Sequence, residues 1–579
     1  MTDMRRTLLW VVFIMSLALL WDGWNKHNGH PTMFGMPIAD ATAPASAAAS
    51  GAAGAASVAA AGGVPSVAGV PATAATAAAA AASAPSEQIT VQTDVMKLTL
   101  DTLGATVTHL ELTGYPDSVD PTHPVVLFDQ SASRTYLAQT GFFNAAGGAP
   151  LPRHLSPFTV VPGERTLKDG ASELNVRFES PEIGGAKLVK TYSFKRGDYT
   201  IRVKHELTNV SAEPITPKIY LQLLRDGRPP EGQSTSYFSS TGFTYTGPAI
   251  YNDASKFKKV EPAEIDKRGA NPSKAEATAN DGWVAMIQHH FVSAWTLPGN
   301  TAPREFVTNK IGSDYTVAMV QPLQTLQPGA TVSHQATLYA GPQDEKKLEA
   351  MEPGLELVKD YGRVTILAKP LFWLLDHLHS LLGNWGWSII ALVVLLKIAF
   401  YWLNASAYKS QAKMKAVNPR IMEMRERLKD KPQEMQQEMM RIYREEKINP
   451  LGGCLPIVVQ MPFFIALYWV LLASVEMRGA PWLGWVHDLS KPDSLFGLLP
   501  LGNMPIGPLP ILMTLSSILQ VALGPKAPDP TQAKMMWLMP LMFSFMFFYF
   551  PSGLVLYWLT NNLLSIAQQW FINKRLGVA

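Results

Sequence analysis

ALVVLLKIAF, residues 391–400, is an apolar stretch that contains one ammonium group, that of Lys397. The apolar run around it covers residues 385–403, which is long enough to cross a bilayer as one helix. A lysine at the centre of a spanning helix costs about 2.5–3.5 kcal/mol on insertion scales. Such residues usually face a partner or a water-filled cavity, so Lys397 is the first candidate functional residue.

The composition indicates a membrane protein that carries a large soluble domain. Only 16% of the 579 residues are charged, whereas about 25% is typical of globular domains. Hydrophobic residues are concentrated in the last third of the chain. The net charge of +3 is too small to indicate DNA or RNA as a partner. The single cysteine, Cys454, excludes an intrachain disulfide.

Changes in composition and periodicity divide the chain into five regions. Basic residues before the apolar run 8–21 predict a membrane anchor, with a cleaved signal sequence as the alternative. Uncharged Ala-rich sequence after the run predicts a flexible linker. Alternating apolar residues, as at Leu174, Val176 and Phe178, predict a large antiparallel β-sandwich. The expected regions are an N-terminal transmembrane anchor at 1–24, a linker at 25–87, a β-sandwich domain at 88–350, an amphipathic interfacial helix region at 351–383 and an α-helical polytopic membrane core at 384–579.

Two local signals predict individual elements. Gly197-Asp198 lies between two strand patterns and predicts a β-hairpin turn. Pro370 precedes leucines that share one helical face, which predicts a short amphipathic helix with Pro370 in its first turn. Because this helix adjoins a membrane-spanning run, we expect it to lie along the membrane interface.

The distribution of charge predicts an orientation in the membrane. With the anchor and the run around Lys397, four further apolar segments give six candidate spans. The loop 404–453 carries eleven lysines and arginines and seven acidic residues, whereas the loop 476–494 carries two cations. Because cytoplasmic loops are rich in Lys and Arg, we expect loop 404–453 and both termini in the cytoplasm and the β domain outside. The four segments are 455–475, 509–523, 535–550 and 553–572.

The loop with eleven cations has an amphipathic pattern of its own. Two apolar stripes, separated by residues 429–432, predict a cytoplasmic helical hairpin at about 404–450. Its mixed charges indicate either a solvated face or a docking site for an anionic partner. The stripes are Ile421, Met424 and Leu428, then Met435, Met439, Ile442 and Tyr443.

No sequence motif indicates covalent chemistry. The chain has no phosphate-binding loop, dinucleotide fingerprint or HExxH motif, so we expect no catalytic residue, cofactor or metal. His289 and His290 are adjacent, and adjacent residues in a strand point to opposite faces. On that reading the two imidazoles would not converge on one metal ion.

Polar residues inside the apolar segments are more informative. For Gln520, Asn561 and Asn562, the alternative to a functional role is a hydrogen bond between helices. Lys397 has no acidic residue within the apolar runs to neutralise it, so we expect its ammonium to face water. The candidate residues are Lys397, Gln460, Gln520, Asn561 and Asn562.

Several motifs occur in the order found in a known family. They resemble those of the YidC membrane insertases and their mitochondrial and chloroplast relatives, over about 360–579. The Ala-rich linker and β domain resemble the Gram-negative form of that family. The motifs are NWGWS at 384–388, the Lys397 position, MEMRER at 422–427, NPLGGC at 449–454, QMP at 460–462 and FPSGL at 550–554.

The resemblance implies five spans around a hydrophilic groove that holds one cation, usually Arg. Lys397 stands at that position and lacks the bidentate fork of arginine. Gln460 matches a second polar groove position. The implied function is the integration and folding of nascent inner-membrane proteins, alone or with the Sec translocon, without enzymatic activity or cofactor. The implied partners are nascent membrane proteins, the Sec translocon, the ribosome through cytoplasmic loops and the C-terminal tail, and the lipid bilayer of the bacterial inner membrane.

Two other function classes remain open at the level of the sequence. A solute transporter would show inverted repeats with paired broken helices, and no such symmetry is evident. A carbohydrate-active enzyme of the cell envelope would need a polar cleft within 88–341. The sequence does not select one there, because the acidic residues of this region are scattered.

Overall fold

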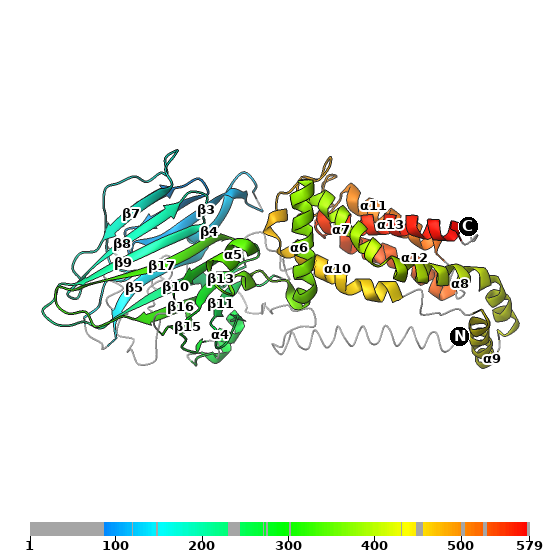
Figure 1. The fold of residues 1–579 in the computed structure, drawn as a ribbon, viewed down its shortest axis with the longest axis horizontal. Coiled ribbons are helices and arrows are strands. Elements are labelled where there is room, and N and C mark those ends of the chain that lie inside the picture. The colour runs from blue at the N-terminus through cyan, green and yellow to red at the C-terminus, as the bar shows by residue number, and fades with distance from the viewer. Residues whose placement is uncertain are drawn as a thin grey trace, which may run out of the picture. The chain divides into compact units, whose positions relative to one another are not determined.

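The computed structural model describes residues 86–575, apart from 119, 146–148, 230–243, 270, 274–275, 300–302, 430, 447–454, 500–503 and 525–529. The described residues form a β domain and a helical unit, and each has its own hydrophobic core (Figure 1). The expected N-terminal anchor and nearly all of the Ala-rich linker lie outside the described residues.

The β domain is a sandwich of two antiparallel sheets, as the alternating pattern predicts. One sheet has eight strands in the order β1-β2-β3-β4-β5-β10-β16-β15. In that order these are Gln88–Gln92, Met96–Asp101, Thr106–Pro116, Pro124–Gln130, Thr135–Asn144, Pro217–Asp226, Asp314–Pro322 and Glu305–Ile311. The other has nine strands in the order β12-β11-β13-β14-β17-β9-β8-β7-β6. These are Lys258–Lys259, Gly247–Tyr251, Trp283–Ile287, Phe291–Thr296, Thr331–Pro342, Thr200–Asn209, Ala186–Lys195, Glu173–Glu179 and Thr159–Val160.

Local sequence signals explain individual strands of this sandwich. β7 buries Leu174, Val176 and Phe178 and exposes the residues between them, so its period of two is confirmed. The predicted turn at Gly197 joins β8 to β9, which pair antiparallel. Gly197 has a φ of +70°, a left-handed conformation that glycine adopts without steric cost.

The histidine pair does not lie in a strand. His289 and His290 occupy the turn between β13 and β14, and their rings stack with centroids 3.7 Å apart. The expectation that the two side chains point to opposite faces is therefore wrong. Among the described residues there is no group of three or more His, Cys, Asp or Glu that could hold a metal ion.

A lysine joins the two sheets inside the sandwich. Lys190 of β8 is 0% exposed, and its Nζ donates hydrogen bonds to the carbonyls of Gly104 (2.7 Å) and Thr140 of β5 (3.0 Å). The same ammonium lies 5.3 Å from the ring centroid of Phe158. Burial lowers the pKa of Lys190 to about 7 because the charged form loses its hydration.

The helical unit is built around its last helix. α13 contacts α7, α8, α10 and α11, and it shares with α10 much of the core of this unit. The helices are α6 (Thr365–Leu382), α7 (Trp385–Ala399), α8 (Tyr401–Arg427), α9 (Pro432–Glu445), α10 (Leu455–Ala473), α11 (Pro508–Leu523), α12 (Pro530–Phe547) and α13 (Ser552–Arg575).

The apolar run around Lys397 is not one straight helix. α7 ends at Ala399, and the chain bends by 69° into α8. The ring of Phe400 packs edge-to-face on Phe463 of α10, with centroids 5.0 Å apart. No Gly or Pro lies at the bend. We therefore attribute the bend to the packing of Phe400 against α10 and not to a helix-breaking residue. The expectation of one helix across 385–403 is wrong for this reason.

The described helices differ in whether their length and hydropathy suffice to cross a membrane. No single one is both long and apolar enough to cross a membrane, and α7 and α8 reach that level only together, as a bent pair. Three shorter apolar helices accompany them, at Val459–Ala473, Pro508–Leu523 and Ala533–Phe547.

The amphipathic helix α6 begins five residues before the expected start. It runs from Thr365, so Pro370 lies inside the helix and not in its first turn. Proline removes the hydrogen bond to the carbonyl four residues earlier, that of Ile366. Pro370 and Ile366 are both exposed, so this carbonyl does not become a buried acceptor without a donor.

The two apolar stripes of the charged loop meet in the structure. Ile421 and Met424 of α8 and Ile442 of α9 are buried together, with the other stripe residues around them. Arg420 reinforces the pairing through ion pairs of 3.2 Å with Glu445 and with Glu446. α8 therefore continues from the bend at Phe400 directly into the predicted helical hairpin.

The buried Lys190 predicts a pH-dependent stability of the β domain. Its pKa is about 7 when folded and near 10.5 when unfolded, so the unfolded chain binds the extra proton between these values. The free energy of unfolding should rise from pH 7 to about pH 9.5, by up to about 3 kcal/mol. Urea unfolding of residues 86–359 at constant ionic strength measures this rise.

Lys190→Met removes the titrating group and should flatten that rise. Lys187→Met on the same strand removes an exposed lysine and should leave the rise unchanged. The domain has its own core, which makes the isolated measurement meaningful. Equal pH slopes for wild type and Lys190→Met would contradict the assignment.

Candidate functional site around Lys397

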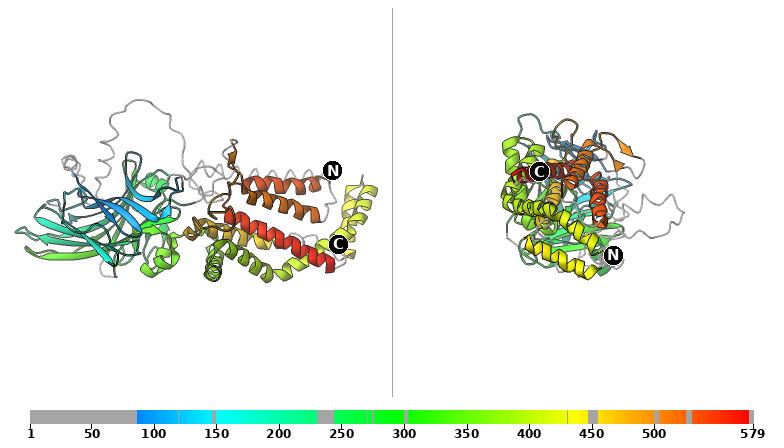
Figure 2. Two further views of the ribbon diagram at one scale, coloured as in Figure 1. Left: turned by 90° about the horizontal axis from the view of Figure 1, so that it is seen from above. Right: turned by 90° about the vertical axis from the view of Figure 1, so that its right-hand side faces the viewer.

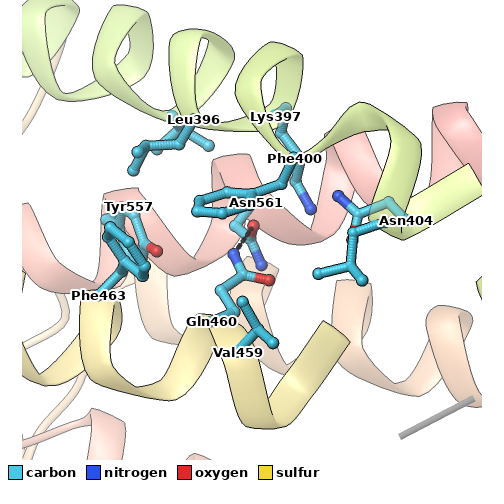
Figure 3. Close-up of a pocket in the computed structure, with 11 residues that line it drawn as sticks. Leu396, Lys397, Phe400, Asn404, Val459, Gln460, Phe463, Tyr557 and Asn561 are labelled. Atoms are coloured by element: carbon cyan, nitrogen blue, oxygen red, sulfur yellow. Dashed lines mark hydrogen bonds between the residues drawn. The ribbon is translucent and has the colours of Figure 1, made fainter. Parts of the chain in front are cut away.

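A pocket lies between α7, α8, α10 and α13 (Figure 3). Its empty space is about 390 Å³ when its side open to solvent is included. Each of the four helices contributes at least one polar side chain and at least one apolar or aromatic side chain to its lining. The lining residues are Val393, Leu396, Lys397, Phe400, Leu403, Asn404, Val459, Gln460, Phe463, Tyr557 and Asn561.

The ammonium of Lys397 is held by a hydroxyl group. Lys397 is in the last turn of α7, and its Nζ donates a hydrogen bond of 2.7 Å to the Oγ of Ser565 in α13. Ser565 in turn donates to the carbonyl of Asn561, also at 2.7 Å. None of the eleven lining residues is acidic. The pocket therefore carries a positive charge that its own lining does not neutralise.

The backbone also favours a cation at this place. The C-terminal end of a helix carries partial negative charge on its free carbonyls, which stabilises a nearby ammonium by about 0.3–1 kcal/mol. Lys397 lies two residues before the end of α7, within reach of that field. The bend at Phe400 thus places the lysine at a helix end, and not at the middle of a continuous span.

A second polar pair faces the lysine across the pocket. The Nε2 of Gln460 on α10 donates to the Oδ1 of Asn561 on α13 at 2.7 Å (Figure 3). Asn404 follows the bend on α8 and is 6% exposed. Lys397, Asn404, Gln460 and Asn561 thus bring one polar side chain from each of four helices to one cavity.

The five candidate residues from the sequence divide into two groups. Lys397, Gln460 and Asn561 line the pocket, whereas Gln520 and Asn562 do not. The Nδ2 of Asn562 donates to the hydroxyls of Ser516 (3.1 Å) and Ser517 (2.9 Å) in α11.

Asn562 therefore joins α13 to α11 and is an interhelical contact. Gln520 is half-buried on α11, outside the pocket lining.

Two pocket-side residues escaped the sequence analysis. Asn404 lies one residue beyond the apolar run and beyond the bend at Phe400, so its spacing from Lys397 does not follow one continuous helix. Ser565 follows Asn561 by four positions, which places both on one face. Helical spacing from Asn561 was the signal that could have found Ser565, whereas Asn404 is recognisable only from the packing of α8 beside the pocket.

Comparisons with known proteins cover the whole chain. The family model described as YidC periplasmic domain matches residues 88–374, and the model described as 60Kd inner membrane protein matches residues 377–578. A membrane protein insertase YidC of Janthinobacterium sp. (strain Marseille) is 50% identical over 582 residues, covering 100% of both chains. Another of Ralstonia nicotianae is 52% identical over 576 residues, covering 99% of this chain and 98% of the relative.

One solved structure covers much of the chain with low similarity. It is described as "Active YidC insertase crystal structure with the first transmembrane domain resolved". It is 17% identical, covers 84% of this chain and 92% of its own, and has a TM-score of 0.37.

Both of these full-length relatives are named membrane protein insertases. These relatives share about half of their residues with the whole chain. They therefore support the insertase class over the solute transporter and the envelope carbohydrate-active enzyme. The chain therefore belongs to the YidC family of bacterial inner-membrane protein insertases, and its β domain is the periplasmic domain of that family.

Proposed function

We propose that the pocket around Lys397 receives polar segments of nascent membrane proteins during insertion. The observation that carries this proposal is an ammonium beside a cavity whose eleven lining residues include no acid. An acidic side chain about 4 Å away would gain about 4 kcal/mol at an effective dielectric constant of about 20. Lys397 is therefore the residue that attracts acidic side chains of a substrate tail or loop.

The amides of the pocket extend this role to uncharged polar segments. A polar group that enters hydrocarbon without a hydrogen bond loses several kcal/mol of hydration. Gln460 and Asn561 pair with each other at 2.7 Å, and either amide can exchange that bond for one to a substrate peptide group. A substrate segment in the pocket would cross less hydrocarbon than one that crosses the bilayer alone.

An exposed apolar face accompanies the pocket. α12 exposes large apolar side chains that we infer contact the entering helix of the substrate. Methionine side chains are flexible, so they can fit apolar surfaces of different shape. The residues are Met535, Trp537, Leu538, Met539, Leu541, Met542 and Phe545, each more than 40% exposed.

The remaining partners and the topology belong to the same proposal. The helical hairpin of α8 and α9 carries most of the cations of its loop, and we infer that it contacts the ribosome, with the C-terminal tail. The Sec translocon is the expected membrane partner. Insertion by attraction and hydrogen bonding forms no covalent bond, so the protein acts without a cofactor and not as an enzyme. Both termini lie in the cytoplasm in this account.

Exchange of the charge at Lys397 tests the electrostatic role. Lys397→Arg keeps the cation and should insert all substrates normally. Lys397→Ala should reduce insertion of a substrate with an acidic tail by about tenfold, which corresponds to about 1.4 kcal/mol, and should spare the same substrate with a neutral tail. Lys397→Glu should be worst for the acidic tail. Pulse-labelled insertion in a depletion strain measures these rates.

Two controls separate this role from a structural one. Lys409→Ala removes an exposed cation from α8, outside the pocket lining, and should have no effect. Protein levels of all variants are compared by immunoblot. Equal defects for acidic and neutral tails at matched protein level would rule out attraction by charge.

Thiol labelling tests the orientation. A chain with Cys454→Ser has no cysteine, and a new one is placed at His487 in the outer loop or at Lys431 in the helical hairpin. Both positions are exposed. A membrane-impermeant maleimide should label residue 487 in intact spheroplasts, and residue 431 only after permeabilisation. The reverse pattern would place the β domain inside and overturn the proposed topology.

A further inference from the structure

The connection between α10 and α11 ends in an uncharged hairpin. No charged residue occurs in 494–507. Two short strands, β18 (Leu498–Leu499) and β19 (Met504–Pro505), pair antiparallel within it. Its described part exposes four large apolar side chains, Leu495 (54%), Phe496 (64%), Leu498 (61%) and Leu499 (41%). Grouped exposed apolar side chains without charge are uncommon on surfaces that face water.

The base of this hairpin is firmly attached to α11. The buried carboxylate of Asp493 accepts hydrogen bonds from the backbone N–H of Leu509 (2.9 Å) and from the indole N–H of Trp485 (3.1 Å). Gly507 supplies no side-chain cap for α11, so Asp493 takes that role at the positive end of the helix. A Cβ at Gly507 would lie 2.0 Å from the Asp493 carboxyl carbon, which shows how closely the two segments meet.

Hydrogen bonds also fix the hairpin itself. The backbone N–H of Phe496 donates to the carbonyl of Ile506 at 2.9 Å, and that of Ile506 donates to the carbonyl of Gly497 at 3.0 Å. The apolar side chains are therefore exposed on an ordered support and are not the result of a frayed loop end.

The exposed apolar surface continues along α11. Leu512, Leu515, Leu519 and Leu523 follow one another at spacings of three or four, and each is more than 40% exposed. In an inner-membrane protein, such a stripe on an apolar helix faces lipid. Figure 2 shows the hairpin in orange in its left-hand view, standing out sideways from the helical unit, across the direction of the long helices. Helices that cross a bilayer run roughly along its normal, so a segment across their direction would lie along the plane of the membrane.

We propose that the hairpin inserts Leu495, Phe496, Leu498 and Leu499 into the lipid of the membrane surface beside α11. The occupant of this apolar surface is phospholipid, at the level of the acyl chains nearest the headgroups. Three observations favour lipid as the occupant. The hairpin has no charged residue, its backbone is fixed by hydrogen bonds, and its exposed apolar surface continues along α11. With the topology proposed above, the lipid belongs to the outer leaflet.

Spin labels on the full-length chain in phospholipid nanodiscs test the insertion. In a Cys454→Ser background, a nitroxide is attached to a cysteine at Phe496 or, separately, at Leu498. Power-saturation EPR then compares collision with oxygen, which concentrates in lipid, and with a water-soluble nickel chelate. A cysteine at Leu515 serves as the lipid-facing control and one at His487 as the water-facing control.

Labels at 496 and 498 should resemble residue 515, with an oxygen-to-nickel ratio several-fold above that of residue 487. A ratio equal to that of residue 487 would place the hairpin in water and overturn the proposal. Low collision with both reagents would place it against protein, either the β domain or a second chain, and would also overturn it.

This outcome is independent of the account of the pocket. Insertion of the hairpin could fail while Lys397 still selects acidic tails, and the reverse could also hold. Only the choice of leaflet rests on the proposed topology, and thiol labelling at residues 431 and 487 tests that separately.

Discussion

The hydrogen bond between the Lys397 ammonium and the Ser565 hydroxyl is the contact on which the arrangement of the pocket depends. It joins the end of α7 to the middle of α13, the helix that contacts four others. A lysine in an apolar run is tolerated when it has an acceptor and a place where charge is useful. Ser565 supplies the acceptor, the bend at Phe400 supplies a helix end, and the lining without acids leaves the charge available to a substrate.

The same requirement explains the other polar residues of the helical unit. Asn561 pairs with Gln460 inside the pocket, whereas its neighbour Asn562 points to α11 and binds two serines. Successive residues of α13 thus serve two purposes, because adjacent positions on a helix face different neighbours. Asn562 stabilises the packing against which the pocket residues are positioned.

The periplasmic domain meets a different constraint. With one cysteine in the chain, it cannot contain a disulfide and relies on its core. That core is continuous across both sheets, and the hydrogen bonds of Lys190 join β8 of one sheet to β5 of the other. Lys190 therefore connects the two sheets by hydrogen bonds at the cost of burying its ammonium group. This burial lowers the pKa of Lys190.

Much of this architecture is predictable from the sequence, for identifiable reasons. Strands such as β7 show a clean period of two, and the helical hairpin shows two apolar stripes, so both elements follow from patterns of side chains. Lys397, Gln460 and Asn561 stand out because each is polar within an apolar segment.

Three features depend on contacts between distant residues. The bend at Phe400 has no local helix-breaking residue, and its packing partner Phe463 is more than sixty positions away. Ser565 becomes recognisable only when α13 lies beside α7. The turn that contains His289 replaces an expected strand, because two short strands end on either side of it.

Photo-crosslinking from inside the pocket tests the central claim most directly. Leu403 lines the pocket, whereas its neighbour Trp402 is 87% exposed and does not, so the two form a matched pair on α8. A photoreactive amino acid at 403 leaves Lys397 in place and should crosslink to the acidic tail of a ribosome-arrested membrane protein. The same group at 402 should not, and Lys397→Ala should remove the crosslink from 403. Equal crosslinks from 402 and 403, or a crosslink from 403 that persists without Lys397, would contradict the account.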